Sequence, residues 1–285
     1  MSGPLIPFWF NNALQTVPLL TIDPSDRGFL LGDGAFETLA VFNGAAIDLS
    51  LHIDRLMNAS GIMGLALARA DVENGAAALL QAHRHVNAVM RITASRGAGI
   101  RGLAADGISP SLLITISPWV KGTLNQPVSL ITSGIRRNET SPASRLKLLS
   151  YADNILAARE AIRLGAGDAM MLNNCGHIAC TTVANIVLVK NGTLYTPPSD
   201  DGALPGIIRK HIGAQPKTLL PSEVFEADGV FLTNSLRLVR PVTRIDNRPL
   251  STRADAQIAA VFVQQCRRIE VECGRDPRTI DTSVM

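Results

Sequence analysis

The chain has 285 residues, of which 46% are hydrophobic and 18% charged, with a formal net charge of +3. This composition excludes disordered and collagen-like chains, and the length fits one large domain or two ordinary ones. The basic residues are scattered, which argues against a nucleic-acid partner, and no apolar stretch reaches the roughly 18 residues that span a bilayer. Because the N-terminus lacks a basic segment followed by an apolar one, we expect a cytoplasmic protein that does not bind membranes.

The predicted elements begin with a hairpin and two helices. Residues 35–49 predict two strands that turn at Asn43 and Gly44, a pair typical of tight hairpins. Residues 51–65 carry apolar side chains at helical spacing, and residues 72–83 predict a second helix. The first part of the chain therefore mixes strands and helices.

Two further strands and a linker follow. Residues 87–95 and 111–117 predict strands. The glycine-rich loop between them, residues 96–107, lacks the spacing of a dinucleotide-binding fingerprint. The pattern then breaks at residues 121–130, which we interpret as an interdomain linker.

The remaining chain continues the alternation of strands and helices. Strands are expected at residues 127–133, at 168–173, in a hairpin over 185–197 that turns at Asn191-Gly192, and at 227–235. Helices are expected at residues 151–165, from Pro205-Gly206 onwards, and at 252–268. The sequence therefore predicts an α+β fold of two domains, an N-terminal α+β domain (1–120) and a C-terminal α/β domain (131–285).

Lysine is scarce in this sequence. The 27 basic residues include only five lysines, none of them in the first 120 residues: Lys121, Lys147, Lys190, Lys210 and Lys217. Four of these lie in polar segments or in the linker, and we expect them to be solvated. Lys147 is flanked by three leucines, and desolvation would lower its pKa and make it nucleophilic towards carbonyls. The alternative is a lysine whose stem packs while its ammonium reaches solvent.

Cysteine and histidine give little indication of a metal site. The four cysteines, Cys175, Cys180, Cys266 and Cys273, form no C-x-x-C pair, and no ligand set with suitable spacing accompanies them. We predict reduced thiols and no bound metal. His52, at a predicted helix start, has no acidic or nucleophilic group beside it that would indicate a catalytic role.

Seven motifs follow one another along the chain: DRGFLLGDGAFETLAVFNG (26–44), HIDRL (52–56), RGAGIRG (96–102), a segment starting LKLLSYADN (146–172), GHIACTTVANIVLVKNGTLYTPP (176–198), ALPGIIR (203–209) and TNSLRLVRPV (233–242). Together and in this order they resemble the motifs of the class IV, or fold type IV, pyridoxal-phosphate (PLP) enzymes. The resemblance implies a two-domain fold like that of D-amino-acid aminotransferase and PLP as cofactor. It also implies a small amino-acid substrate and a homodimer, with a site between the two domains sealed by a loop from the neighbouring subunit.

The resemblance assigns cofactor roles residue by residue. Lys147 matches the Schiff-base lysine that also moves the proton, and Tyr151 matches the tyrosine that bonds the phenolic oxygen of the cofactor. Arg55, in HIDRL, matches the arginine that binds the phosphate, a task suited to the bidentate donors of a guanidinium.

Further residues match the phosphate cradle and the substrate pocket. The resemblance implies that the backbone N–H groups of Ile207 and Ile208, together with Thr182 and Ser235, contact the cofactor. Ile208 stands where the family often has a threonine, and one lost hydrogen bond costs roughly 1 kcal/mol. For the substrate, the resemblance implies Arg101 as the carboxylate-binding arginine, Phe36 as an aromatic wall and Asn234 as a further contact.

Cys180 is the main departure from the family pattern. It occupies the motif position of the glutamate that pairs with the pyridine nitrogen of the cofactor. A thiol with an ordinary pKa near 8.5 is a weak and neutral partner, so the ring would hold less negative charge. Transamination depends on that capacity more than elimination does. The alternatives are that another group or a water protonates the nitrogen, or that the motif is shifted by one residue.

The motifs divide between two activities. TNSLRLVRPV and RGAGIRG more closely resemble the motifs of aminodeoxychorismate lyases, and Cys180 agrees on physical grounds; these enzymes eliminate pyruvate from 4-amino-4-deoxychorismate to give 4-aminobenzoate. Glu37 and the SYADNILAAREA segment favour an aminotransferase, which passes an amino group from a D-amino acid or branched-chain L-amino acid to 2-oxoglutarate. We predict the lyase, with the aminotransferase as the alternative and a weakly active PLP-binding homologue as a minor one.

Overall fold

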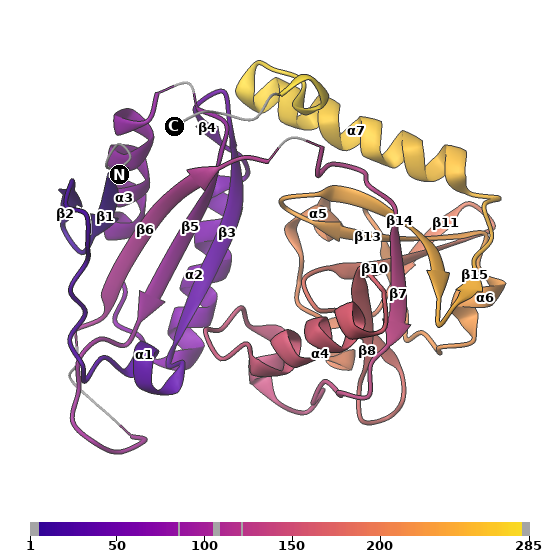
Figure 1. Cartoon of the computed structure of the whole chain (residues 1–285), viewed down its shortest axis with the longest axis horizontal. Coiled ribbons are helices and arrows are strands. Elements are labelled where there is room, and N and C mark those ends of the chain that lie inside the picture. Colours follow the sequence, from indigo (N-terminus) through magenta and orange to yellow (C-terminus); the bar gives the residue numbers. More distant parts are fainter. Residues whose placement is uncertain (1–5, 85, 105–108, 121, 281–285) are drawn as a thin grey trace. The chain divides into compact units, whose positions relative to one another are not determined.

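A computed structural model describes residues 6–84, 86–104, 109–120 and 122–280 (Figure 1). Lys121 of the predicted linker and residues 105–107 of the predicted glycine-rich loop lie outside these ranges. Contacts between Cα atoms divide the chain into two units. The first comprises Met1–Lys121, Lys147–Ser150 and Ile269–Met285, and the second comprises Gly122–Leu146 and Tyr151–Arg268. Lys147 thus groups with the N-terminal unit, and the predicted domain boundaries stay a prediction.

The first unit is built on an antiparallel sheet whose strands lie in the order β2-β1-β6-β5-β3-β4 within the described residues. The strands are β1 (Phe8–Phe10), β2 (Ala13–Gln15), β3 (Gly34–Phe42), β4 (Ala45–Ala46), β5 (Ala88–Ser95) and β6 (Ser111–Pro118). The predicted turn between β3 and β4 is confirmed, because Asn43 and Gly44 both have positive φ angles, 51° and 79°. Such a turn matches the twist of the two strands that it joins.

Three helices accompany this sheet, α1 (Arg27–Leu31), α2 (Leu49–Met63) and α3 (Arg69–Ala82). Helices α2 and α3 pack on the sheet through buried apolar side chains: Ile53, Leu56 and Leu79 from the helices, and Leu39, Met90 and Ile114 from the strands. The two predicted helices are confirmed with shifted ends. The short helix α1, whose N-terminus is capped by Asp26, was not predicted from the sequence, nor were β1 and β2.

The second unit is built on a mixed sheet, ordered β12-β11-β10-β13-β14-β7-β8-β9 in the described part of the chain, with β15 paired to β14. Its strands are β7 (Val128–Thr132), β8 (Asp168–Leu172), β9 (Ile178–Thr181), β10 (Asn185–Lys190), β11 (Thr193–Thr196), β12 (Gln215–Pro216), β13 (Gly229–Asn234), β14 (Leu238–Ile245) and β15 (Arg248–Pro249). The interior strand β7 runs parallel to both neighbours, β14 and β8. The predicted hairpin turn at Asn191 and Gly192 is confirmed, with both residues at positive φ.

The helical segments of the second unit include α4 (Ala152–Arg163), α5 (Ile207–His211), α6 (Glu223–Glu226), and the 3₁₀ turns η1 (Pro142–Arg145) and η2 (Ser199–Asp201). Helix α7 (Asp255–Cys273) begins in this unit, and its last residues group with the first, as does η3 (Pro277–Thr279). Helix α4 packs on β8 and β9 through small side chains, Ala157 and Ala161 against Ala169 and Ala179. These small side chains let α4 approach β8 closely, and β8 pairs with β9, the strand that carries Cys180.

No helix among the described residues is long and apolar enough to cross a membrane.

Candidate active site

Lys147 lies on a short extended segment that pairs with the beginning of β3. The Phe36 N–H donates to the Lys147 carbonyl (2.9 Å), and the Leu149 N–H donates to the Gly34 carbonyl (2.9 Å). The neighbouring Leu148 is buried, whereas Lys147 is half-buried. The lysine is therefore fixed through its backbone, and its side chain lies beside the residues of β3.

A buried ion cluster lies on β3 and α2 of the same unit. The Glu37 carboxylate, with no exposed surface, accepts from Arg55 Nε at Oε1 and from Arg55 Nη2 at Oε2, both at 2.7 Å. Glu37 Oε2 also lies 2.7 Å from His52 Nδ1. Burial opposes ionisation of Glu37, but Arg55 and His52 outweigh it and lower its pKa to about 2. Burial, in turn, lowers the pKa of His52, although Glu37 opposes that shift.

Sequence reasoning missed this cluster, because it found no acidic group beside His52. The acid is Glu37, which lies fifteen residues away along the chain and reaches His52 only when α2 packs on β3. One signal was present. Glu37 is a charged residue within a strand of otherwise apolar and small residues, and a buried carboxylate needs partners. The cluster means that Arg55, the predicted phosphate ligand, is oriented by Glu37.

Phe36 has two cations beside its ring. Lys147 Nζ lies 4.3 Å from the ring centroid, and the Arg91 guanidinium carbon lies 4.0 Å from it. Both distances are within the range of cation–π attraction. Arg91 comes from β5 and was not predicted from the sequence, although a charged residue in the apolar segment AVMRIT was a signal. The structure thus brings together Lys147, Phe36, Arg55 and the unpredicted Arg91.

The environment lowers the pKa of Lys147 from 10.5 to about 8. Burial is the largest cause, because it disfavours the charged ammonium; Glu37 opposes the shift, and the Arg55 and Arg91 cations add to it. With this pKa, roughly one tenth of the amine is unprotonated at pH 7, against about one part in several thousand for an ordinary lysine. This is the state in which a lysine attacks a carbonyl or accepts a proton.

Replacing Arg91 by methionine should raise the pKa of Lys147 above about 8, because one of the cations that disfavour the ammonium is removed. The rise should be smaller than the shift produced by burial. It can be measured in the cofactor-free protein, from the pH dependence of Lys147 modification by an amine-reactive reagent followed by mass spectrometry. The control is Arg84→Met, at an exposed arginine that does not affect this pKa. An unchanged or lower pKa in the Arg91 variant would contradict the assignment.

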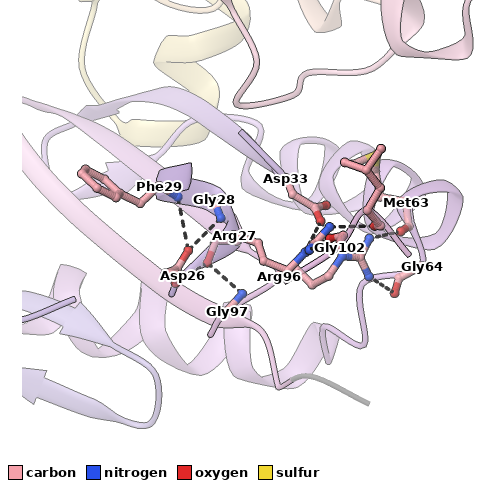
Figure 2. A network of polar contacts seen from close by, with 12 residues as sticks. Asp26, Arg27, Gly28, Phe29, Asp33, Met63, Gly64, Arg96, Gly97 and Gly102 are labelled. Atoms are coloured by element: carbon pink, nitrogen blue, oxygen red, sulfur yellow. Dashed lines mark hydrogen bonds and ion pairs between the residues drawn. The ribbon is translucent and has the colours of Figure 1, made fainter. Parts of the chain in front are cut away.

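Arg101 lies on the loop that follows β5, and its side chain is exposed. Figure 2 shows the polar network that holds this loop, in which Arg27 and Arg96 share the carboxylate of Asp33. The structure therefore places Arg101 in the same unit as Lys147, on a loop bound by the residues of the DRGFLLGDG motif.

In the second unit, three of the predicted cofactor residues lie at the start of α4, on β9 and just after β9, namely Tyr151, Cys180 and Thr182. Tyr151 stands at the N-terminal end of α4. The Thr182 N–H and hydroxyl both donate to Asp168 Oδ1, at 3.2 and 2.6 Å, and the Thr182 carbonyl accepts from Asn154 Nδ2 at 2.7 Å. Thr182 is buried, and its hydrogen bonds fix the chain just after β9.

Cys180 lies on β9, opposite Met171 of β8, and is buried among apolar side chains that include Ile131, Ala157 and Ala169. Burial raises the pKa of its thiol to about 11, with a further rise from Asp168 and an opposing effect of Arg137. The thiol is therefore neutral at physiological pH. The Cys180 thiol is therefore even less able to carry negative charge than a cysteine with an ordinary pKa near 8.5, and it differs further from an ionised carboxylate.

The predicted phosphate cradle begins at Gly206, the residue before α5. A Cβ at Gly206 would lie 1.9 Å from Asn185 Oδ1, so only glycine fits there. Asn185 Nδ2 donates to the Leu204 carbonyl (2.8 Å) and holds the turn. No side chain caps the first turn of α5 in the described structure, where the N–H groups of Ile207 and Ile208 lack helical partners.

Arg209 follows on the same helix and was not predicted from the sequence. Its Nη1 is buried and has no hydrogen-bond partner among the described residues, and burial lowers its pKa. A buried cationic donor without an acceptor favours binding of an anion nearby.

Asn234 and Ser235 lie where β13 ends. The Asn234 side chain accepts from the backbone N–H groups of Leu236 (3.1 Å) and Arg237 (2.8 Å), and it donates to the Val183 carbonyl (3.3 Å). It therefore holds the turn that presents Ser235. A small pocket beside this turn is lined by residues that include Asp168, Val183, Asn234 and Arg237.

All four cysteines are free, and within the described ranges no three histidine, cysteine or acidic side chains are grouped as metal ligands would be.

Comparison with known proteins identifies relatives over most of the chain. Residues 34–245 match the family model "Amino-transferase class IV". Curated relatives include a branched-chain-amino-acid aminotransferase of Pseudomonas aeruginosa, 29% identical over 77% of this chain and 78% of that protein. An aminodeoxychorismate lyase of Bacillus subtilis is 28% identical over 79% of this chain and 82% of that protein, and a D-alanine aminotransferase of Bacillus licheniformis is 26% identical over 86% and 90%.

Solved structures give the same family and fold. A provisionally assigned 4-amino-4-deoxychorismate lyase of Legionella pneumophila is 30% identical, with a TM-score of 0.78 over 87% of this chain and 96% of that one. The branched-chain amino acid aminotransferase of Escherichia coli is 20% identical, with a TM-score of 0.84 over 97% of this chain and 98% of that one, and it supports the fold alone. The predicted fold type IV is confirmed. The relatives carry three different activities.

Proposed function

Because the chain belongs to the class IV aminotransferase family, whose members are PLP-dependent aminotransferases and lyases, we propose that it is a 4-amino-4-deoxychorismate lyase. The reaction breaks the bond between the ring and the enolpyruvyl oxygen. It releases pyruvate and leaves 4-aminobenzoate.

Cys180 carries this proposal. At the motif position of the family's glutamate it provides a neutral buried thiol with a pKa of about 11. Such a group cannot stabilise positive charge on a pyridine nitrogen as a carboxylate does, so the ring would hold less negative charge. Transamination needs that charge to be held, whereas in an elimination it leaves with the departing group. The substitution therefore favours the lyase.

The side chains of each unit fit the phosphate and aldehyde of PLP. Lys147 has the lowered pKa that an amine needs to react with an aldehyde. In the second unit, the first turn of α5 has no side-chain cap and Nη1 of Arg209 has no hydrogen-bond partner among the described residues, and both suit a phosphate. We propose that Arg55, Lys147, Tyr151, Cys180, Thr182, Ile207, Ile208 and Ser235 contact PLP, and that Phe36, Arg101 and Asn234 contact the substrate.

PLP, when bound, supplies an electron-withdrawing ring conjugated to the carbon that bears the substrate amine. The work of the chain is then to bind anions and move protons. Lys147 Nζ takes the proton from that carbon and returns one to the methylene carbon of the departing enolpyruvate. Arg101 binds a substrate carboxylate through bidentate hydrogen bonds, and Phe36 forms an apolar wall beside Lys147.

An aminotransferase acting on D-amino acids or branched-chain L-amino acids is the second candidate. Glu37 favours it, because lyases of this family often have a threonine at that motif position, and here Glu37 binds Arg55 at 2.7 Å. Two of the three curated relatives described above are aminotransferases.

One set of assays separates these functions. The purified protein is incubated with PLP and 4-amino-4-deoxychorismate, and pyruvate is followed with lactate dehydrogenase. The lyase should release pyruvate and 4-aminobenzoate in equal amounts without an added keto acid. Rapid conversion of bound PLP to its amine form by D-alanine or L-leucine, without pyruvate release from aminodeoxychorismate, would establish the aminotransferase. Failure of both reactions with PLP bound would leave the weakly active homologue.

The Cys180→Glu variant should convert PLP to its amine form at least about tenfold faster with an amino-acid donor. A hydrogen bond to a charged group is worth about 1.5–3 kcal/mol, and each 1.4 kcal/mol changes a rate about tenfold. The measurement is stopped-flow absorbance of the bound cofactor. Cys180→Gln is the control, because glutamine has nearly the same size but no charge. Equal rates for the two variants would mean that residue 180 does not face the ring nitrogen.

Assembly and location are further parts of the proposal. We propose a homodimer, which is supported by exposed apolar side chains of the first unit, namely Phe29 (78% exposed), Leu30, Leu31, Ile100 and Leu103. Sedimentation equilibrium tests it, and a monomer at micromolar concentration would contradict it. The cytoplasmic location expected from the sequence stays a prediction.

A further inference from the structure

Within one subunit, the described residues of the loop that carries Arg101 are held by polar contacts. The side chains of Ile100 and Leu103 are 78% and 85% exposed in a single subunit, so apolar packing inside the subunit contributes little to the conformation of these residues. Gly102 has a φ of 131°, a backbone conformation that other residues rarely adopt. A loop of this kind keeps one conformation only if its backbone groups are bound.

Arg27 binds that backbone directly. Its side chain is only 5% exposed. Nη1 donates to the Gly102 carbonyl, and Nη2 donates to the Leu103 carbonyl at 2.8 Å. One guanidinium therefore holds the two carbonyls that immediately follow Arg101, as Figure 2 shows for Gly102. A planar fork of donors suits this task, whereas a lysine ammonium could not hold both carbonyls in the same geometry.

Asp33 fixes Arg27 and links it to α2. Its Oδ2 accepts from Arg27 Nε at 2.9 Å and from Arg96 Nε at 2.7 Å. Arg96 also donates to the carbonyls of Met63 and Gly64, at the C-terminal end of α2 (Figure 2). Burial opposes ionisation of Asp33, but Arg96 and Arg27 outweigh it and keep its pKa below the usual value.

Backbone hydrogen bonds complete the connection. The Arg27 N–H donates to the Gly97 carbonyl (2.9 Å), and the Arg96 N–H donates to the Asp33 carbonyl (3.0 Å). Asp33 immediately precedes β3, the strand of Phe36 and Glu37, and α2 carries Arg55. The Arg27–Asp33–Arg96 clamp therefore ties the Arg101 loop to the strand and helix that hold the other predicted anion-binding and pocket residues.

We propose that Arg27, Asp33 and Arg96 are positioning residues that fix Arg101 and thereby set the affinity of the enzyme for its substrate carboxylate. The functional part of this proposal rests on the role of Arg101 in the proposed function. The clamp does not touch the reacting atoms, so it should affect substrate binding more than turnover.

The test uses the holoenzyme with Arg27→Lys and Asp33→Asn, two substitutions that keep size or charge similar. Hydrogen exchange followed by mass spectrometry should show amides 99–103 exchanging about tenfold faster or more, since hydrogen bonds to charged groups are lost. KM for the amino-acid substrate should rise about tenfold while kcat changes less than about twofold. Arg69→Lys is the control, because Arg69 forms an exposed ion pair with Glu73, away from this loop, and should change neither readout.

A double-mutant cycle with Arg101→Met separates the clamp from the role of Arg101. In the Arg101→Met background, Arg27→Lys should raise KM no further. An equal further rise, or unchanged exchange of amides 99–103, would overturn the proposal. If Arg101→Met leaves KM unchanged while Arg27→Lys still speeds exchange, the role assigned to Arg101 is wrong and the clamp only anchors the loop. Accelerated exchange throughout the first unit would show general destabilisation and would also overturn the proposal.

Discussion

Lys147→Met should reduce turnover by about 10²–10⁴-fold, the range typical for loss of a positioned acid–base group. Lys147 is the only lysine that the sequence places between leucines, and in the structure its segment pairs with the beginning of β3 and its pKa is about 8. The variant should also lose covalent attachment of PLP to residue 147 after borohydride reduction, which peptide mass spectrometry detects. Lys210→Met, at an exposed lysine of α5, is the matched control and should keep both properties.

The stability of this variant distinguishes a functional lysine from a structural one. The unfolded chain holds the Lys147 proton up to a pH of about 10.5, whereas the folded chain holds it only up to about 8. Below pH 8 the folded protein must therefore carry a charge that its site disfavours, which reduces the free energy of unfolding. In the cofactor-free proteins, Lys147→Met should fold at least as stably as the wild type at pH 7, by urea denaturation. A clear loss of stability would indicate that the lysine is retained for packing.

The elements that the sequence predicts correctly are those that depend on residues close together in the chain. The turns at Asn43-Gly44 and Asn191-Gly192 depend on two adjacent residues, and both have the positive φ angles that their sequence demands. Helix α4 ends two residues before Gly165, whose φ is 74°, so the predicted stop is confirmed. The sequence does not predict the short strands β1 and β2, because three residues are too few to show an alternating apolar pattern. These strands form through their pairing with each other and of β1 with β6.

The sequence predicts only some of the residues that form the candidate site. It identifies Lys147 because its leucine neighbours are adjacent in the chain, and Cys180 because of its position in a motif. By contrast, Glu37 and His52 meet only after α2 packs on β3, and Arg91 reaches Phe36 only through the pairing of β3 with β5. Such contacts join residues that are far apart in the chain. They depend on tertiary packing, and no spacing between residues in the sequence identifies them.

Glu37→Gln should lower the free energy of unfolding by about 3–5 kcal/mol, the range for removing one partner of a buried ion pair. Arg55 would keep its charge in a partly buried site and lose its bidentate acceptor. His52, which is fully buried, would face a neutral amide instead of a carboxylate. Urea denaturation at pH 7 measures this loss. Glu73→Gln, which breaks an exposed ion pair with Arg69, is the control and should cost at most about 1 kcal/mol.

The same variant should also change the pKa of Lys147. Glu37 favours the charged ammonium, so its replacement by a neutral side chain should bring the pKa below about 8, opposite in sign to the effect of Arg91→Met. The two variants thus form a matched pair around one lysine. If both move the pKa in the same direction, a change in burial and not charge would be the cause.

The pH dependence of stability identifies Glu37 as the source of the effect. Its pKa is about 2 in the folded protein against an ordinary 4.5, so the unfolded chain takes up a proton first as the pH falls. The stabilisation by its ionised form is therefore complete above a pH of about 4.5 and is lost as the pH falls towards 2. Because loss of Glu37 only lowers the pKa of His52 further, the difference in unfolding free energy between wild type and Glu37→Gln should not shrink from pH 7 to 5, and it should shrink between pH 4.5 and 2. A difference that persists at pH 2 would mean that the glutamine costs stability through packing, with the carboxylate charge contributing little.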